Sequence, residues 1–146
     1  MKVTRSRELR APVAEVWRLL CDPYAIPRWW PLARRVEAVT DVGWTVLLGK
    51  PGGRALRADQ RLEASDDERL RRWSLVVPGS PFERLLTASV VEARLSPARA
   101  GSELRLEQCQ SPRGWARFGA FMLRRAARRQ LDEALDGMAR AVEAAP

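Results

Sequence analysis

The hydrophobic pattern of this chain changes period near residue 110, and this change constrains the fold more than any other feature. Residues 34–110 form a series of strand candidates in which apolar and charged side chains alternate, as in "LRADQRLEAS" at 56–65. Further along, apolar residues recur every three, four or five positions, which is typical of one long amphipathic helix. The apolar stripe of that helix comprises Trp115, Phe118, Met122, Ala126, Leu131, Leu135, Met138 and Val142.

An antiparallel sheet with one apolar face must have that face covered, and only this helix is long enough to cover it. Upstream, residues 2–10 predict an opening strand, and "APVAEVWRLLCD" at 11–22 predicts a short helix. A second short helix should end before Pro31, because a residue that precedes proline disfavours helical geometry. The expected fold is α+β: a curved antiparallel sheet of about six to seven strands, in the order β-α-α-β-β-β-β-β-β-α, wrapped around the C-terminal helix. No repeat or linker divides the sequence, so residues 1–146 are expected to form a single domain.

Several kinds of chemistry are excluded by composition. The chain has no histidine, which rules out Ser-His-Asp, Cys-His and histidine–metal sites. Cys21 and Cys109 are too few for a disulfide framework and match no zinc-ligand spacing. No metal and no cofactor is therefore expected. Glu83 lies near a predicted turn and Asp59 on the charged face of its strand, so these two carboxylates do not form an inward-facing pair, and catalysis is not favoured.

The net charge of +8 arises from 26 basic and 18 acidic residues, and all but two of the basic residues are arginine. The arginines are scattered along the whole chain, so a nucleic-acid partner is not expected. No apolar run approaches the roughly 20 residues that a membrane span needs, and the first residues lack the apolar segment of a signal peptide. A cytoplasmic protein is expected, either a monomer or a homodimer.

Polar residues interrupt the apolar face of the predicted sheet. The alternation places Gln60, Thr87, Ser89 and Gln108 among leucine, valine and alanine side chains. A buried amide without a partner costs on the order of 1–3 kcal/mol, so these residues indicate bound water, a mutual network or a ligand with a few polar groups. Gln110 also falls on this face but adjoins a turn, where contact with solvent is expected.

Arg71 is predicted to share a side of its strand with Trp73. Two environments are compatible with this position. The guanidinium group either enters an internal cavity, where it would bind a carboxylate, or lies at a strand end and extends to water.

Aromatic residues gather in a connecting segment and at the start of the long helix. The stretch "DPYAIPRWWP" at 22–31 places Trp29 and Trp30 between two prolines. These tryptophans either fill the end of the core or form the wall of a cavity. Trp115, Phe118 and Met122 in the first turns of the long helix present the same two alternatives.

Three segments resemble the START/Bet v 1-like helix-grip superfamily, often called SRPBCC, and its polyketide cyclase/dehydrase-type bacterial members. They are "LRAPVAEVWRLLCDPYAIPRWWP" at 9–31, "GSELRLEQ" at 101–108 and "GWARFGAFMLRRAARRQLDEALDGM" at 114–138. The resemblance implies that the helix leaves a deep cavity in the concave side of the sheet for an apolar molecule, with the short helices closing one end. The residues expected to line it are Trp29, Trp30, Gln60, Arg71, Trp73, Thr87, Ser89, Gln108, Trp115, Phe118 and Met122.

The expected function is therefore binding of a hydrophobic small molecule, such as a lipid, a polyketide or an isoprenoid-like compound, by a carrier or sensor. One alternative is a polyketide cyclase/dehydratase-type enzyme that works without a metal or histidine. The other is a protein-interaction or chaperone co-factor module recruited by the arginine-rich helix, in which Arg124, Arg125, Arg128 and Arg129 would contact the partner.

Overall fold

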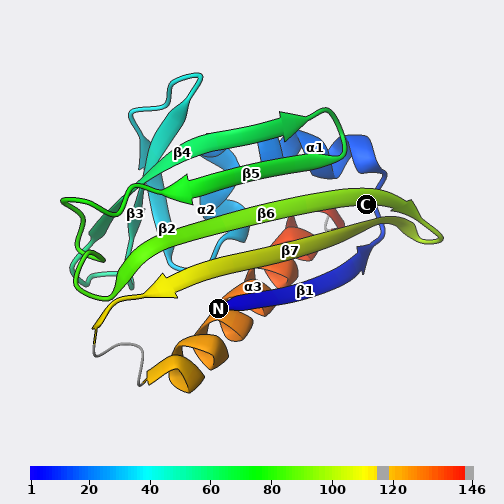
Figure 1. Cartoon of the computed structure of the whole chain (residues 1–146). Coiled ribbons are helices and arrows are strands. Elements are labelled where there is room, and N and C mark those ends of the chain that lie inside the picture. The colour runs from blue at the N-terminus through cyan, green and yellow to red at the C-terminus, as the bar shows by residue number, and fades with distance from the viewer. Residues whose placement is uncertain (115–118, 144–146) are drawn as a thin grey trace.

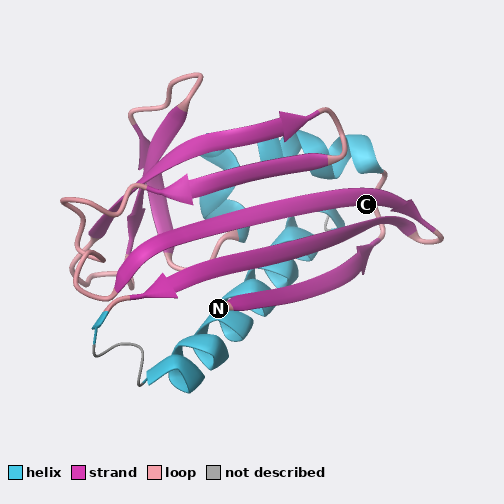
Figure 2. Ribbon diagram, in the orientation of Figure 1, coloured by secondary structure: helices cyan, strands magenta, loops and turns pink. Residues whose placement is uncertain are grey.

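The computed structural model describes residues 1–114 and 119–143 of the 146-residue chain. A seven-stranded sheet, antiparallel at every pairing, curves around one long helix (Figures 1 and 2). The order of strands across the sheet is β1-β7-β6-β5-β4-β3-β2. The strands are β1 (Lys2–Leu9), β2 (Ala33–Glu37), β3 (Gly43–Leu48), β4 (Leu56–Asp66), β5 (Leu70–Leu75), β6 (Leu86–Ala98) and β7 (Gly101–Pro112).

The helices all lie on one side of this sheet (Figure 2). They are α1 (Val13–Cys21), a single 3-10 turn η1 (Pro23–Ala25), α2 (Ile26–Trp29) and α3 (Ala120–Glu143). The predicted α+β helix-grip fold is confirmed, with η1 as an additional turn between the two short helices. In the described part of the chain, no helix is both long enough and apolar enough to cross a membrane.

The turn that carries the tryptophans is fixed by local chemistry. The carboxylate of Asp22 accepts a hydrogen bond of 3.0 Å from the backbone N–H of Tyr24 and so starts η1. Trp30 has extended backbone geometry (ψ 130°), as expected for the residue before Pro31, and α2 therefore ends at Trp29. The two tryptophans are thereby held at the end of a rigid, proline-bounded segment.

The core lies between the concave face of the sheet and the C-terminal half of α3. Leu104 and Leu106 of β7 are fully buried, as are Leu131 and Met138 of α3. Ion pairs at the surface join the same half of α3 to β1 and to the residue that follows it: Arg5 pairs with Asp132 (2.7 Å), Arg7 with Asp136, and Arg10 with Glu143 (3.8 Å).

The buried stripe of α3 differs from the prediction in its first turns. The predicted stripe stepped by five residues from Ala126 to Leu131, and a 3.6-residue period does not support such a step. The structure instead continues the stripe backwards from Leu131 to Ala127, which is buried, while Ala126 is exposed. Met122 is consequently 67% exposed and contributes nothing to the core. Trp115 and Phe118 lie outside the described residues.

Candidate functional site

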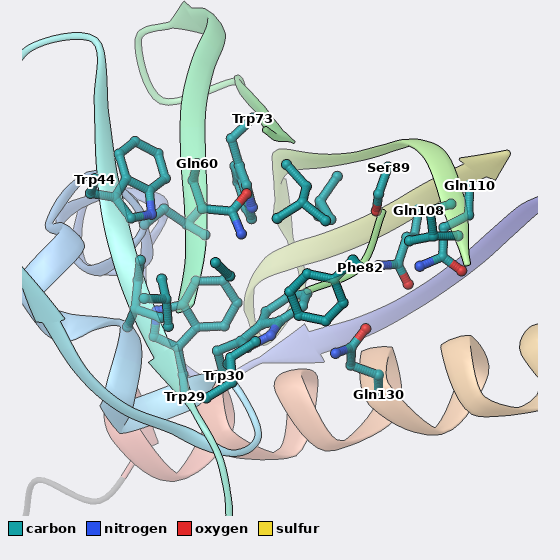
Figure 3. Close-up of a pocket in the computed structure, with 18 residues that line it drawn as sticks. Trp29, Trp30, Trp44, Gln60, Trp73, Phe82, Ser89, Gln108, Gln110 and Gln130 are labelled. Atoms are coloured by element: carbon teal, nitrogen blue, oxygen red, sulfur yellow. The ribbon is translucent and has the colours of Figure 1, made fainter. Parts of the chain in front are cut away.

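A cavity of about 120 Å³ lies between the tryptophan-bearing segment, the concave face of the sheet and α3. Figure 3 shows the 18 side chains around it. Tryptophans gather at one end, and glutamines approach from the strands and from α3. The lining comprises Leu20, Ile26, Trp29, Trp30, Trp44, Val46, Leu48, Ala58, Gln60, Trp73, Leu75, Phe82, Leu86, Ser89, Val91, Gln108, Gln110 and Gln130.

Four tryptophans form the aromatic wall: Trp29 at the end of α2, Trp30 directly after it, Trp44 on β3 and Trp73 on β5. Trp29 of α2 makes edge-to-face contacts with Trp30 (ring centroids 5.6 Å apart) and with Trp73 of β5 (6.5 Å). Trp44 of β3 lies 6.5 Å from Trp73 at a tilted angle. Edge-to-face geometry is the favoured arrangement of aromatic pairs. Because Trp29 is only 3% exposed and each ring packs against another, the wall is a fixed surface.

Five polar side chains form the polar part of the lining. They come from four elements: Gln60 on β4, Ser89 on β6, Gln108 and Gln110 on β7, and Gln130 on α3. None of the hydrogen bonds between described residues uses any of these side chains. Their polar atoms are therefore free to bond to something that occupies the cavity.

The strand register explains why these side chains meet. Ser89 pairs with Gln110, and Val91 pairs with Gln108, so all four side chains point to the same face of neighbouring strands. Figure 3 shows Gln130 pointing from α3 towards this region. The glutamines of β7 and the amide of α3 thus approach one another across the cavity.

Three buried polar atoms among the lining residues are unsatisfied. The indole N–H groups of Trp29 and Trp44 and the amide oxygen of Gln108 have no hydrogen-bond partner among the described residues. Gln108 is only 5% exposed. Each such atom costs on the order of 1–3 kcal/mol relative to a satisfied group. The chain therefore retains, at this site, polar atoms that its described residues do not satisfy.

The cavity has no titratable side chain among its 18 lining residues. Asp59 faces the opposite side of β4, where its carboxylate accepts hydrogen bonds from Thr45 (2.6 Å) and Arg57 (3.1 Å). Glu83 is exposed and contacts the backbone N–H of Gly79 (3.3 Å). In the part of the chain that is described, no cluster of three or more acidic or cysteine side chains is placed to hold a metal ion.

Arg71 lies in neither of the two environments that the sequence predicted. Its guanidinium carbon is 5.6 Å from the ring centroid of Trp44, and its Nη1 donates a long hydrogen bond of 3.5 Å to the Ser65 hydroxyl. A bulge in β4 between Leu62 and Ala64 brings Ser65 opposite Arg71. The residue is 8% exposed and does not line the cavity; instead it supports the aromatic wall by a cation–π contact.

Cys21, at the end of α1, lies near this arginine. Burial raises the pKa of the Cys21 thiol, and the charge of Arg71 offsets only part of that effect. The residue is therefore a neutral thiol near pH 7 and not a reactive thiolate.

Thr87 also lies outside the cavity, because β6 contains a bulge that the sequence pattern did not reveal. The pairing of β6 with β7 shifts by one residue between Leu86 and Ala88. An extra residue reverses the side-chain direction on one side of the bulge, so Leu86 faces the cavity and Thr87 faces away. The Thr87 hydroxyl donates a hydrogen bond to the backbone oxygen of Ser111 (3.2 Å).

Of the predicted set, Trp29, Trp30, Gln60, Trp73, Ser89 and Gln108 line the cavity. Met122 is exposed on α3 and lies elsewhere. Sequence reasoning missed Trp44, Phe82 and Gln130, and it expected Gln110 to face solvent. Gln110 is covered because β7 continues to Pro112, and its backbone bonds to that of Met1 while it pairs with Ser89. Gln130 could have been found from the sequence, because it is an uncharged polar residue within the apolar stripe of α3.

The sequence matches the profile of a family described as polyketide cyclase / dehydrase and lipid transport, over residues 1–143. The chain belongs to this family. No protein of curated function has a significantly similar sequence. The family membership confirms the resemblance stated from the sequence.

Several solved structures share the fold of this chain. A START superfamily protein from Mycobacterium smegmatis superposes with a TM-score of 0.78 at 12% identity, covering 97% of each chain. A conserved protein from Geobacillus kaustophilus superposes with a TM-score of 0.79 at 15% identity, and the match covers 98% of this chain and 95% of that protein. The di-domain ARO/CYC protein StfQ from the steffimycin biosynthetic pathway superposes with a TM-score of 0.78 at 15% identity. The match covers 97% of this chain and 50% of StfQ. At these identities the similarity establishes the fold alone.

Proposed function

We propose that this member of the polyketide cyclase / dehydrase and lipid transport family binds a neutral, largely apolar, ring-containing small molecule in the cavity, as a carrier or sensor. One observation carries the proposal: Gln60, Ser89, Gln108, Gln110 and Gln130 face an aromatic-walled cavity without bonding to any described protein group. Binding sites for small molecules typically combine an apolar lining with a few polar groups that fix orientation.

The charge of the lining favours a neutral ligand. A buried, unpaired carboxylate is strongly disfavoured, and none of the 18 described lining residues carries a positive charge to pair with one. Arg71 is separated from the cavity by its position against Trp44 and is not among the lining residues. Amide groups can donate or accept, so hydroxyl and keto oxygens on a ligand are equally suitable partners.

The size of the cavity favours a compact, flat group. At about 120 Å³ it is comparable to the cavity of roughly 150 Å³ that binds benzene in an engineered protein. Aromatic rings would stack on Trp29, Trp30 or Trp73, and any oxygen substituent would face the glutamines. This arrangement favours a ring system over an extended acyl chain as the group that occupies the site.

Three probes of similar shape test the proposal: 2-naphthol, naphthalene and 2-naphthoate, compared by thermal shift and by quenching of tryptophan fluorescence at pH 7. We expect 2-naphthol to stabilise the protein most, naphthalene less and the anionic 2-naphthoate least. Equal or stronger binding of 2-naphthoate, or no stabilisation by any neutral ring compound, would overturn the proposal.

A matched pair of variants localises the site. Ser89→Ala removes a hydroxyl from the cavity, and Ser96→Ala removes one from an exposed position of the same strand. A single hydrogen bond contributes about 0.5–1.5 kcal/mol, so Ser89→Ala or Gln108→Leu should weaken 2-naphthol binding roughly threefold to tenfold. Ser96→Ala should leave binding unchanged.

Catalysis of a cyclisation or dehydration is the second candidate, and the family description is what favours it. The lining residues that the structure describes offer hydrogen-bonding amides to orient a polyketone but no titratable group to move a proton. Turnover of a reactive polyketone that is lost in Gln108→Leu and retained in Ser96→Ala would establish this activity. Binding without turnover across a panel of polyketones would favour the carrier or sensor.

A further inference from the structure

The first three turns of α3, residues 120–129, carry large apolar side chains into solvent. Phe121 is 74% exposed and Met122 is 67% exposed. Because they are consecutive in a helix, they project about 100° apart. Arg125, three and four positions further on, extends between them and is also exposed. Exposed apolar residues of this size, placed together, indicate a contact surface.

The same turns concentrate positive charge. Arg124, Arg125, Arg128 and Arg129 are all exposed, and no acidic residue occurs from 119 to 131. None of these four arginines forms an ion pair with a carboxylate of the described residues. Of the four acids in the second half of the helix, Asp132, Asp136 and Glu143 pair with arginines of β1 and the residue after it, and the fourth, Glu133, is exposed.

This placement of charge is unfavourable for the isolated helix. Like charges at positions i and i+4, as in Arg124 and Arg128 or Arg125 and Arg129, repel each other. An external anionic surface would compensate for this repulsion.

We propose that residues 120–129 dock the protein on the surface of an anionic lipid bilayer. Guanidinium groups would contact the headgroups, while Phe121 and Met122 would insert into the boundary between headgroups and acyl chains. A bilayer is favoured over a nucleic acid or an acidic protein because apolar and cationic side chains alternate around the exposed face. A planar interface accommodates both kinds at once. The proposal does not depend on the identity of the cavity ligand.

Co-sedimentation with vesicles tests this directly, using the whole chain without added ligand. Vesicles of phosphatidylcholine alone are compared with vesicles containing 30% phosphatidylglycerol, at about 50 and 500 mM salt. Arg124→Glu/Arg128→Glu is compared with Arg54→Glu/Arg99→Glu, which reverses two exposed arginines that form no ion pair with a described carboxylate. Both variants carry a formal net charge of +4, since each changes the starting +8 by −4. A third variant, Phe121→Gln/Met122→Gln, removes the apolar contacts.

We expect binding to the anionic vesicles at low salt and little binding to phosphatidylcholine alone or at high salt. Each arginine near an anionic surface increases the partition coefficient onto the membrane roughly fivefold. Arg124→Glu/Arg128→Glu should therefore weaken partitioning by about 25-fold or more, whereas Arg54→Glu/Arg99→Glu should weaken it much less. Phe121→Gln/Met122→Gln should also weaken it. Positions 124 and 128 are exposed, so the arginine variant should remain folded, which its melting temperature checks.

Three results would overturn the proposal. One is no binding to the anionic vesicles. Another is an equal loss of vesicle binding in Arg124→Glu/Arg128→Glu and Arg54→Glu/Arg99→Glu, which would show that the attraction depends on net charge alone. The last is binding to a homopolymeric RNA or to polyglutamate that persists while vesicle binding is absent.

Discussion

The backbone of Trp29 lies directly against Gly137 of α3. A Cβ atom at position 137 would be only 2.8 Å from the Cα atom of Trp29. Glycine within a helix reduces its stability by roughly 0.5–1 kcal/mol relative to alanine, so its presence at this position requires a reason in the packing. The close approach brings α2 onto α3 and sets the position of the aromatic wall.

Gly137→Ala should therefore destabilise the protein and shift the wall. Overpacking of this kind typically costs about 1–3 kcal/mol, which corresponds to a decrease of roughly 2–12 °C in melting temperature for a chain of this length. Gly119→Ala is the matched control, because a Cβ at position 119 meets no atom of the described residues within 4 Å. Thermal unfolding of the two variants checks the prediction. Equal melting temperatures would mean that the contact between α2 and α3 is not tight.

Filling the cavity should separate binding from stability. Ser89→Val adds apolar volume at a lining position and suits a strand, so the melting temperature should be unchanged or slightly higher. Binding of 2-naphthol should weaken at least tenfold, because the added methyl groups occupy its space. Ser96→Val, on the exposed side of the same strand, provides the comparison. Unchanged affinity in Ser89→Val would place the ligand somewhere other than this cavity.

Acid should weaken the sheet through Glu92, on the outer face of β6. Burial alone would raise the pKa of this carboxyl, but hydrogen bonds from Arg72 (2.6 and 2.9 Å) and Arg94 (2.8 Å) outweigh it and lower the pKa. The stabilisation of the folded state by ionised Glu92 is therefore complete above the pKa of the unfolded chain, about 4.3. It is lost as the pH falls through the lower pKa of the folded state.

Melting temperatures between pH 2 and 7 test this effect. Glu92→Gln should be less stable than the parent chain at pH 7, and the difference should shrink below about pH 4. Glu103→Gln, at an exposed position of β7 without an ion pair to any described residue, should follow the parent at every pH. A constant difference between Glu92→Gln and the parent would show that protonation of Glu92 is not the cause.

Cys21 should be slow to alkylate. Burial raises the pKa of its thiol above the ordinary value of 9.0, so only a small fraction is thiolate at pH 8. In a Cys109→Ser background, the rate of reaction with iodoacetamide should keep rising beyond pH 9. Replacing Arg71 with methionine removes a nearby positive charge and should slow the reaction further. Mass spectrometry follows the modified fraction, and a rate that levels off below pH 8 would contradict the assigned pKa direction.

The alternation of strands such as 56–65, followed by one long amphipathic helix, was sufficient to predict the architecture. Alternation also placed Gln60, Ser89 and Gln108 on the concave face, and the prolines around Trp29 predicted the end of α2 correctly. These features depend on local periodicity and on backbone restrictions, and both can be read from sequence.

Features that depend on a single inserted residue could not be predicted in this way. The alternating pattern runs through Thr87 without interruption, yet a bulge turns that side chain outward. The buried stripe of α3 is a different case, because the 3.6-residue period favours Ala127 over Ala126 and could have shown this from the sequence. Gln130 and Trp44 meet the other lining residues through tertiary contacts, which have no local signature.

The pairing of β1 with β7 also has a consequence for how the protein folds. Lys2 lies opposite Cys109, and Leu9 lies opposite Ser102, so β1 bonds to the strand of the sheet that is most distant from it in sequence. Contacts so distant in sequence slow folding, because a long loop must close before they form. On the ribosome, the nascent β1 therefore lacks its native partner strand until β7 has emerged, and during that interval it is a candidate for protection by chaperones.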